Sequence, residues 1–146
     1  ATSQSAWFET GKMDEPWEAQ WVTCDADEPR HPLFSKVLRL DAPVESARLY
    51  ICGLGLYQAF IDGARVSDEL LAPGTHAFDK WLQYQTYDVT DLLGEGSHEL
   101  DVVLGNGWYK GRFGFIRMED GFYGNDWRLL AELRVQYADG REQVIE

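Results

Sequence analysis

The chain has 146 residues, with 13 Lys and Arg against 25 Asp and Glu, and its formal net charge is −12. A chain of this length can bury one hydrophobic core but leaves no room for a separate catalytic domain. Nucleic-acid affinity comes largely from clustered Lys and Arg, so the charge argues against a nucleic-acid partner, and the same sign disfavours an anionic membrane surface. No apolar run is long enough to cross a bilayer.

The N-terminal segment differs from the rest of the chain. Gly11 to Pro16 is typical of a polar turn and is followed directly by Trp17. We interpret residues 1–14 as the tail of a preceding domain or a linker. Residues 15–146 are expected to form one β-sandwich module whose C-terminal end is truncated.

Alternation of apolar and polar residues dominates the remaining sequence. In residues 99–105, for example, Leu100, Val102 and Leu104 fall on one face, which is typical of a half-buried strand. The strands predicted in this way cover residues 20–24, 34–40, 47–51, 59–61, 64–66, 83–88, 99–105, 128–137 and 143–145.

Turn signals separate these strands. Asp62-Gly63 and Asp139-Gly140 each suit a type I′ turn, which needs two positive φ angles, so each predicts a β-hairpin. One helical turn is predicted at residues 90–93, with Asp88 or Thr90 as N-cap and Gly94 at its end. Short strands without alternating helices predict an all-β fold, an antiparallel β-sandwich of the jelly-roll kind.

Two Gly-rich pairs resemble a nucleotide-binding loop, but their spacing is wrong. The dinucleotide fingerprint needs a third Gly three residues after the second, and Gln58 and Lys110 occupy those places after residues 53–55 and 105–107. We interpret these glycines as residues of turns and bulges.

The Cys and His residues do not form a recognisable metal motif. Cys24 and Cys52 fit neither a metal pair nor a disulfide framework and are expected to be free thiols. His31, His76 and His98 are too far apart in sequence for zinc-ligand spacing.

Carboxylates are plentiful, and most of them lie beside turn residues. A glycosidase needs two of them on either side of a sugar ring, and calcium needs several oxygen ligands. Abundance alone favours neither, and residues 25–28 and 119–120 are typical of solvated loops. A small stand-alone glycosidase or lyase that uses two loop carboxylates stays as an alternative function.

Residues 108–127 form the most informative segment. They contain seven aromatic residues and four glycines, which predicts a long structured loop rather than a strand. Aromatic faces beside charged and amide groups suit a sugar ring, because the ring's C–H face lies on the aromatic plane and its hydroxyls take hydrogen bonds. The alternative, which the composition favours slightly, is that these aromatics fill the end of the sandwich or pack on a neighbouring domain.

Several motifs, in order along nearly the whole chain, resemble those of bacterial α-L-rhamnosidases of glycoside hydrolase family 78. They are Trp7-Phe8-Glu9-Thr10-Gly11 with Trp17 and Trp21, Ala47-Arg48-Leu49-Tyr50, Gly53-Leu54-Gly55-Leu56-Tyr57, Asp62-Gly63, Leu71-Ala72-Pro73-Gly74, Tyr84-Gln85-Thr86-Tyr87-Asp88-Val89-Thr90 and Gly105-Asn106-Gly107-Trp108-Tyr109-Lys110-Gly111-Arg112. The family usually has Asn-Gly in place of Asp62-Gly63, a difference that preserves the turn.

The resemblance implies the N-terminal β-sandwich module, a jelly-roll of the galactose-binding-like type. In this family an (α/α)6 barrel carries the catalytic acids, so the module alone is expected to be non-catalytic and has no catalytic residues to assign. In some relatives such a module binds terminal L-rhamnose with calcium. The resemblance therefore implies two partners, a rhamnose-containing glycan or the parent enzyme's catalytic barrel, and it makes calcium a possible cofactor without assigning metal ligands.

No motif maps ligand residues onto this chain, so candidates are chosen by their chemistry. They combine oxygen or amide groups with aromatic platforms near predicted strand ends. The predicted carbohydrate-binding residues are Asp79, Trp81, Asn106, Trp108, Arg112, Asn125, Asp126 and Trp127.

Overall fold

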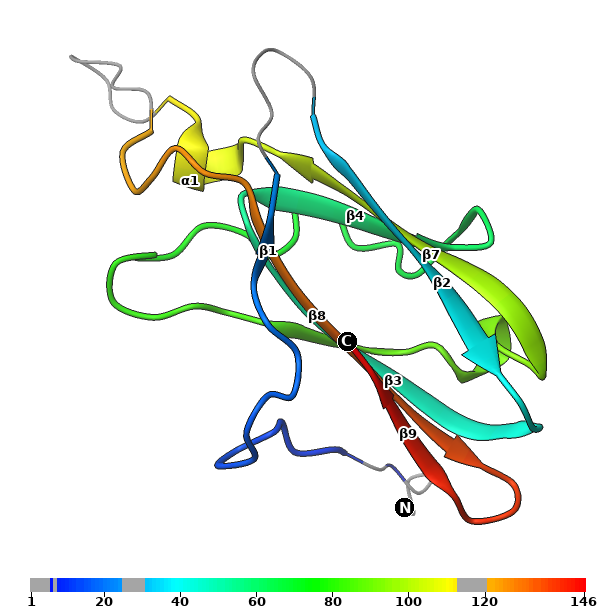
Figure 1. Cartoon of the computed structure of the whole chain (residues 1–146). Helices are drawn as coiled ribbons and strands as arrows, with labels where there is room; N and C mark the ends of the chain where they lie inside the picture. The colour runs from blue at the N-terminus through cyan, green and yellow to red at the C-terminus, as the bar shows by residue number, and fades with distance from the viewer. Residues whose placement is uncertain (1–5, 7, 25–30, 113–120) are drawn as a thin grey trace, which may run out of the picture.

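The structure is a computed structural model that describes residues 6, 8–24, 31–112 and 121–146. The strands are β1 (Val22–Thr23), β2 (Leu33–Leu40), β3 (Val44–Leu54), β4 (Leu56–Ile61), β5 (Ala64–Arg65), β6 (Gln85–Asp88), β7 (Gly96–Gly105), β8 (Arg128–Tyr137) and β9 (Glu142–Ile145). A 3-10 helix, η1 (Thr90–Leu92), and a short helix, α1 (Gly107–Lys110), complete the elements (Figure 1). No helix in the described ranges is long and apolar enough to span a membrane.

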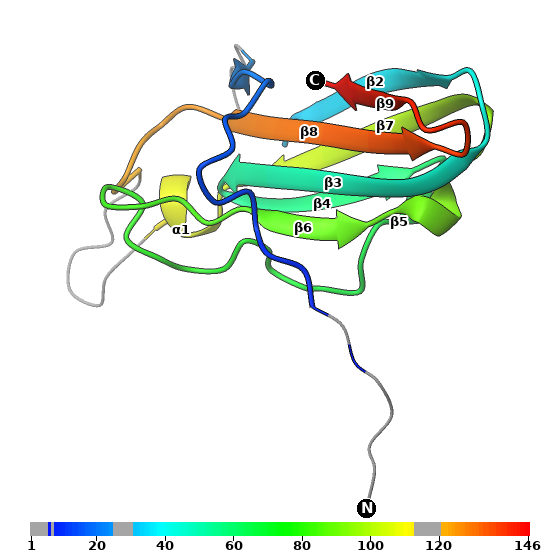
Figure 2. The same ribbon diagram turned by 90° about the horizontal axis from the view of Figure 1, so that it is seen from below.

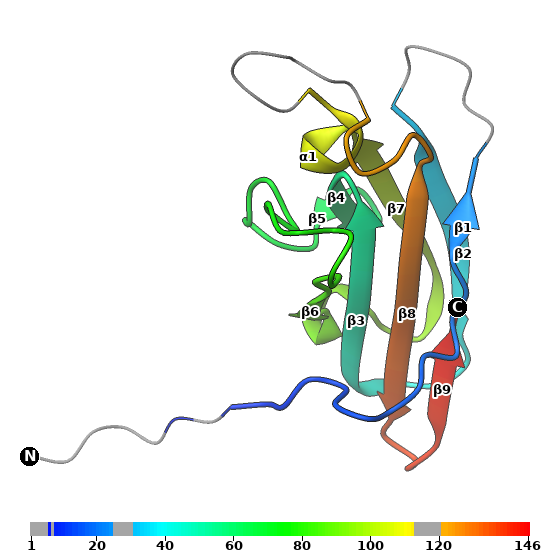
Figure 3. The same cartoon turned by 90° about the vertical axis from the view of Figure 1, so that its left-hand side faces the viewer.

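The strands form two antiparallel sheets that face one another (Figures 2 and 3). Sheet A has the order β1-β8-β3-β6, with β9 paired to β8 as well. Sheet B has the order β2-β7-β4-β5. The predicted all-β antiparallel sandwich is confirmed.

The hydrophobic core lies between the two sheets. Leu49 and Ile51 of β3 point inward together with Leu133 of β8, and Val102 and Leu104 of β7 face them from sheet B; each of these side chains is at most 2% exposed. Burying such a side chain contributes roughly 1.5–3 kcal/mol. The period-two pattern of the sequence therefore corresponds to the observed inward faces.

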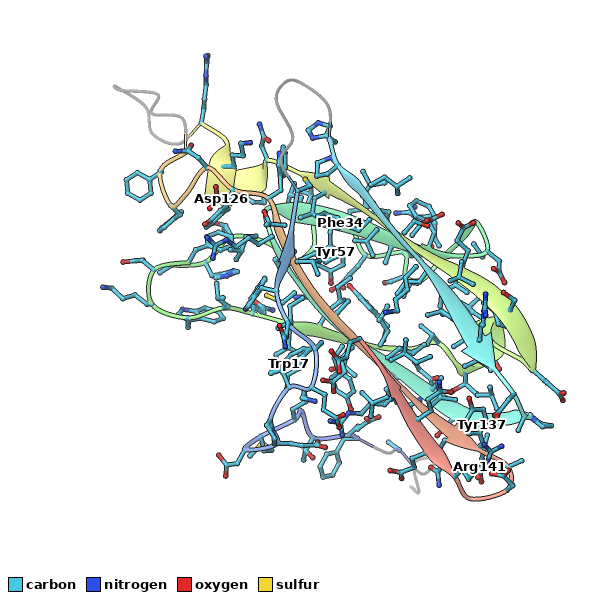
Figure 4. The ribbon with its side chains drawn as sticks, viewed as in Figure 1. Trp17, Phe34, Tyr57, Asp126, Tyr137 and Arg141 are labelled. Carbon is cyan, nitrogen blue, oxygen red and sulfur yellow. The ribbon has the colours of Figure 1, made fainter. Side chains whose placement is uncertain are left out.

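Along one side of the sandwich the core is less fully covered. An apolar groove of about 340 Å³ separates β2 from β1 and β9, and Phe34, Leu100 and Ala131 are among its lining residues (Figure 4).

The two predicted hairpins are both present, but their turns differ. Asp62 and Gly63 have φ angles of 50° and 78°, and Ile61 pairs with Ala64, which confirms the type I′ turn. In the β8–β9 hairpin only Gly140 has a positive φ, 86°, so the type I′ prediction is wrong there. The Gly140 N–H donates to the Tyr137 carbonyl, so the turn includes Ala138 as well as Asp139. The loop is therefore longer than the two residues of a type I′ turn.

The predicted helical turn is present as η1. Its N-cap position is Val89, which lies between the two predicted candidates. The Asp88 carboxylate accepts hydrogen bonds from the Thr90 N–H and hydroxyl, at 3.1 and 2.6 Å. The Thr90 hydroxyl in turn accepts from the Ala47 N–H at 2.9 Å, which fixes η1 against β3.

One helix was not predicted. Residues 105–107 were expected to be a turn and residues 108–127 a loop, yet Gly107 begins α1. Gly107 has a φ of 51°, and an added Cβ would lie 2.8 Å from the Leu56 backbone nitrogen, so the helix starts where the chain passes close to the first residue of β4. Residues 113–120 of the predicted loop lie outside the described residues.

The outer face of sheet A is covered by the N-terminal segment. Ala19 packs on Cys52 and Leu130, with Trp17 and Tyr84 at their side. Lys12 of this segment contacts the sheet directly through Glu132. The interpretation of residues 1–14 as a preceding tail or linker stays a prediction.

Candidate functional site

The predicted loop residues gather at one end of the sandwich. We call this region the aromatic end and define it as residues 76–82, 106–110 and 121–127. The first range lies between β5 and β6, the second directly follows β7 and the third directly precedes β8. Figures 1 and 3 show α1, the segment before β8 and the connection between β5 and β6 at this end. Backbone hydrogen bonds from the Gly121 N–H to the Lys110 carbonyl and from the Tyr123 N–H to the Tyr109 carbonyl join two of the segments.

The aromatic end has its own small core. Leu54, Phe78 and Tyr109 are buried together, and the partly buried Trp108 and Tyr123 pack against them. The Phe78 ring lies 5.4 Å from that of Tyr109 and 5.3 Å from that of Tyr123. Most aromatics of this region therefore stabilise the end of the sandwich.

Trp81 is the predicted platform that remains open. Its indole is 53% exposed and contacts the His76 ring at 4.8 Å between centroids, with 32° between the planes. Its position follows from a tight turn, in which the Lys80 and Trp81 N–H groups both donate to the Ala77 carbonyl. A partly supported indole that faces solvent is suited to stacking on a ligand.

His76 was not singled out as a ligand from the sequence. Its ring lies 3.8 Å from the Phe78 ring, and both ring nitrogens are buried without a hydrogen-bond partner among the described residues. Burial lowers the pKa of His76, so the ring is neutral at pH 7. The aromatic residues Phe78 and Trp81, two and five positions after His76, are the sequence feature from which this ring packing could have been predicted.

Trp127 does not form a platform. It is only 5% exposed and belongs to the main core, with the Lys110 ammonium 4.2 Å from its ring centroid and the His31 ring 5.8 Å away. Trp108 is half-buried in the core of the aromatic end. Of the three predicted Trp residues, only Trp81 can offer most of one ring to a ligand.

The predicted polar residues lie on the surface. Asp79 forms an ion pair with Lys80 at 3.2 Å, and Asp126, labelled in Figure 4, forms one with Arg128 at 2.9 Å. The remaining three are also exposed; they are Asn106, Arg112 and Asn125. The described ranges contain no group of three or more His, Cys, Asp or Glu side chains that could hold a metal ion. Calcium binding stays a prediction.

The best-connected carboxylate lies elsewhere, on the outer face of sheet A. Glu132 is fully buried and accepts hydrogen bonds from the Lys12 ammonium at 2.5 Å, from the Arg134 guanidinium at 2.8 Å and from the Glu18 N–H at 2.7 Å. Burial raises the pKa of Glu132, but these donors outweigh it and lower the pKa to about 2. No sequence pattern predicts the pairing of Lys12 with Glu132, because Lys12 lies in a polar segment and Glu132 at an outward strand position.

The chain is similar to known α-L-rhamnosidases. Residues 42–146 match the family described as the α-L-rhamnosidase N-terminal domain. An α-L-rhamnosidase of Streptomyces avermitilis is 44% identical over 102 residues, which are 70% of this chain and 10% of that protein.

Solved structures agree with the sequence match. Native α-L-rhamnosidase from Aspergillus terreus has a TM-score of 0.81 at 39% identity, over 88% of this chain and 15% of that one. The Streptomyces avermitilis enzyme, solved in complex with L-rhamnose, has a TM-score of 0.72 at 42% identity, over 77% of this chain and 11% of that one. The chain thus spans about a tenth to a sixth of these relatives. It belongs to the α-L-rhamnosidase N-terminal domain family.

Proposed function

We propose that this chain is a non-catalytic accessory module of an α-L-rhamnosidase and that its aromatic end binds terminal L-rhamnose. The enzyme that contains it would hydrolyse α-L-rhamnosides with residues outside this chain. The observation that carries the binding role is the open indole of Trp81, and the complex of the Streptomyces avermitilis relative with L-rhamnose supports a sugar ligand.

The chemistry around Trp81 suits a deoxy-sugar. The apolar C–H face and the methyl group of rhamnose would lie on the indole, where stacking contributes beyond the area it buries. Asp79, two residues away and exposed, could accept hydrogen bonds from the sugar hydroxyls, and a bond to an ionised carboxylate is stronger than a neutral one. Calcium, if it takes part, would have to share such oxygen ligands with the sugar hydroxyls.

Four carboxyl groups can be set aside as the general acid of a stand-alone glycosidase. A glycosidase needs a general acid whose pKa is raised, so that it still carries a proton at the working pH. Hydrogen bonds lower the pKa of Asp62, Asp88, Glu132 and Asp139, so none of these four carboxyls is suited to be that acid. The stand-alone glycosidase or lyase would be adopted if the purified chain turned over an aryl rhamnoside and lost that activity on changing one Asp or Glu.

Calorimetry with L-rhamnose tests the binding role. We expect heat of binding at millimolar sugar, and Trp81→Ala should weaken the affinity about tenfold or more, which corresponds to about 1.4 kcal/mol. Phe122→Ala is the matched control, because Phe122 is also 53% exposed at the same end but packs edge-on against Tyr123. Parallel titrations with calcium and with a chelator decide whether the metal is needed. No heat under either condition would contradict the binding role.

A second role is favoured by further exposed apolar side chains of the aromatic end. Leu82 and Phe122 are 41% and 53% exposed, so the aromatic end could instead pack on the catalytic barrel of the parent enzyme. A silent calorimetric titration of the isolated chain, together with protection of Trp81 from oxidation in the full-length enzyme, would support this role over sugar binding.

A further inference from the structure

The outer face of sheet B carries an apolar groove that neither proposed role uses. We call it the sheet B groove. It is lined by Leu56, Tyr57, Gln58, Leu70, Leu71, Val103 and Gly105. Val103 lies on the solvent side of β7, since its neighbours Val102 and Leu104 are buried. Leu70 and Leu71 reach the groove from the connection between β5 and β6.

The exposure of these side chains is high for aliphatic residues. Leu70 is 73% exposed, Leu71 59% and Val103 37%, and Leu33, which pairs with Val103, adds a further side chain at 61%. Contiguous exposed aliphatic side chains mark interaction surfaces in soluble proteins more often than isolated ones do.

The backbone holds one of these leucines in an unfavourable conformation. Leu71 has a φ of 62°, in the left-handed region, where a bulky residue is a rare outlier. The loop is fixed there by hydrogen bonds from the Tyr57 N–H to the Ala72 carbonyl and from the Gly74 N–H to the Leu71 carbonyl. Strained residues of this kind concentrate at functional and binding sites.

Acidic groups border the apolar residues. Asp101 shares the outer side of β7 with Val103, two positions away, and the exposed Asp68 lies two residues before Leu70. The Arg65 guanidinium on the same face donates to Gln58 at 2.6 Å. The groove is therefore an apolar centre with a mainly negative border, and it complements an apolar ridge flanked by Lys and Arg.

We propose that the sheet B groove docks another domain of the same rhamnosidase, one that presents aliphatic side chains bordered by Lys and Arg. This inference rests on the proposed function, because the chain spans only a tenth to a sixth of its relatives and the rest of such a polypeptide would supply the docking partner. A stable interface between independent partners typically takes about 20–30 residues on each side, whereas the groove has seven lining residues. A covalently linked domain needs less, since its effective concentration is high.

Hydrogen exchange in the full-length enzyme and in the isolated chain tests the docking surface. We expect the peptide that covers residues 68–74 to exchange roughly tenfold or more slowly in the full-length enzyme. The double variant Leu70→Ser/Leu71→Asn should abolish that protection, and Asn is chosen because it tolerates the left-handed conformation of Leu71. The control is Val37→Thr, which changes a 54% exposed aliphatic residue on the same sheet but outside the groove, and it should keep the protection.

Thermal unfolding separates docking from misfolding. The double variant should leave the melting temperature of the isolated chain nearly unchanged, because both leucines are exposed, and should lower that of the full-length enzyme. Equal exchange of residues 68–74 in both proteins would overturn the inference, and so would concentration-dependent dimerisation of the isolated chain that the double variant removes. A full-length protein that does not hydrolyse an aryl rhamnoside would instead contradict the proposed function.

Discussion

The Lys12 ammonium lies 2.5 Å from the Glu132 carboxylate, although 120 positions separate the two residues in the chain. Both side chains are at most 2% exposed, and the Lys12 ammonium also lies 4.9 Å from the Trp17 ring centroid and 5.0 Å from that of Tyr50. This contact attaches the N-terminal segment to the outer face of sheet A. On that face Ala19 and Trp17 of the segment pack with Cys52 and Leu130, which are buried.

Removing one partner of this pair should be costly. Lys12→Met keeps the aliphatic length but leaves Glu132 as a buried carboxylate without its ammonium, which typically costs about 3–5 kcal/mol. Urea unfolding followed by tryptophan fluorescence measures the loss. Arg141→Ala, which breaks the exposed ion pairs to Asp41 and Asp139, serves as the control and should leave the unfolding midpoint nearly unchanged. Equal midpoints for both variants would show that the N-terminal segment does not depend on Lys12.

Glu132 should also determine part of the acid stability. Its pKa is about 2 in the folded chain against an ordinary value of 4.5, so the unfolded state binds the proton first. The stabilisation is fully present above pH 4.5 and is lost as the pH falls from there toward 2. Glu132→Gln should therefore be less stable than the parent chain at neutral pH, and the difference should shrink on acidification. A difference in unfolding midpoint that stays constant between pH 7 and about pH 2.5 would contradict this assignment.

The histidines His98 and His76 should titrate on opposite sides of the ordinary value of 6.5. A hydrogen bond with Asp62, at 2.6 Å, raises the pKa of His98, whereas burial lowers the pKa of His76. His98 therefore contributes stability below pH 6.5 that is lost as the pH rises through its folded-state pKa. An NMR titration of the ring protons gives both values, and Asp62→Asn should lower the pKa of His98 alone. A pKa of His76 above that of His98 would show that the assigned contacts are wrong.

The sequence predicted the features that depend on local chemistry. Alternation placed the strands, and Asp62-Gly63 specified its turn because both residues adopt positive φ at little cost. The turn at Gly140 was misassigned because the number of loop residues, which depends on where β8 stops pairing, is a tertiary property. α1 was missed since a four-residue helix has no periodicity of its own and is held by contacts with β4.

The candidate site was predictable only in part, for the same reason. Composition indicated a cluster of aromatic residues in 108–127, but it could not show that Trp127 is buried while Trp81 is open, because burial depends on the tertiary packing around each residue. Lys12 and Glu132 are separated by almost the whole chain, and no local pattern links them. Long-range polar pairs of this kind require the fold.

The two cysteines should react at different rates. Cys52 is 3% exposed on the outer face of β3, and burial raises its pKa to about 11, so its thiolate is scarce at neutral pH. Cys24 is only partly buried and should be alkylated first by iodoacetamide at pH 8. Peptide mapping after brief labelling measures the order, and both residues should react equally in urea. Lys12→Met should accelerate labelling of Cys52 selectively, because the segment that covers it is released. Fast labelling of Cys52 in the unaltered chain would show that this cover is open.

The contact between Gly55 and Gly105 should be intolerant of a side chain. Gly55 has a φ of 124°, and an added Cβ would lie 2.2 Å from the Gly105 carbonyl oxygen, which belongs to the strand that leads into α1. Gly55→Ala should therefore cost about 3 kcal/mol or more and displace α1, which carries Trp108 and Tyr109. Gly63→Asn is the matched control, because Gly63 also has a positive φ but no atom lies within 4 Å of its added Cβ; the cost there should be about 1 kcal/mol or less. Chemical unfolding gives both energies, and near-ultraviolet circular dichroism reports the packing of the aromatic end. If Gly55→Ala kept the parent spectrum and stability, the close approach of Gly55 to Gly105 would not be what positions the aromatic end.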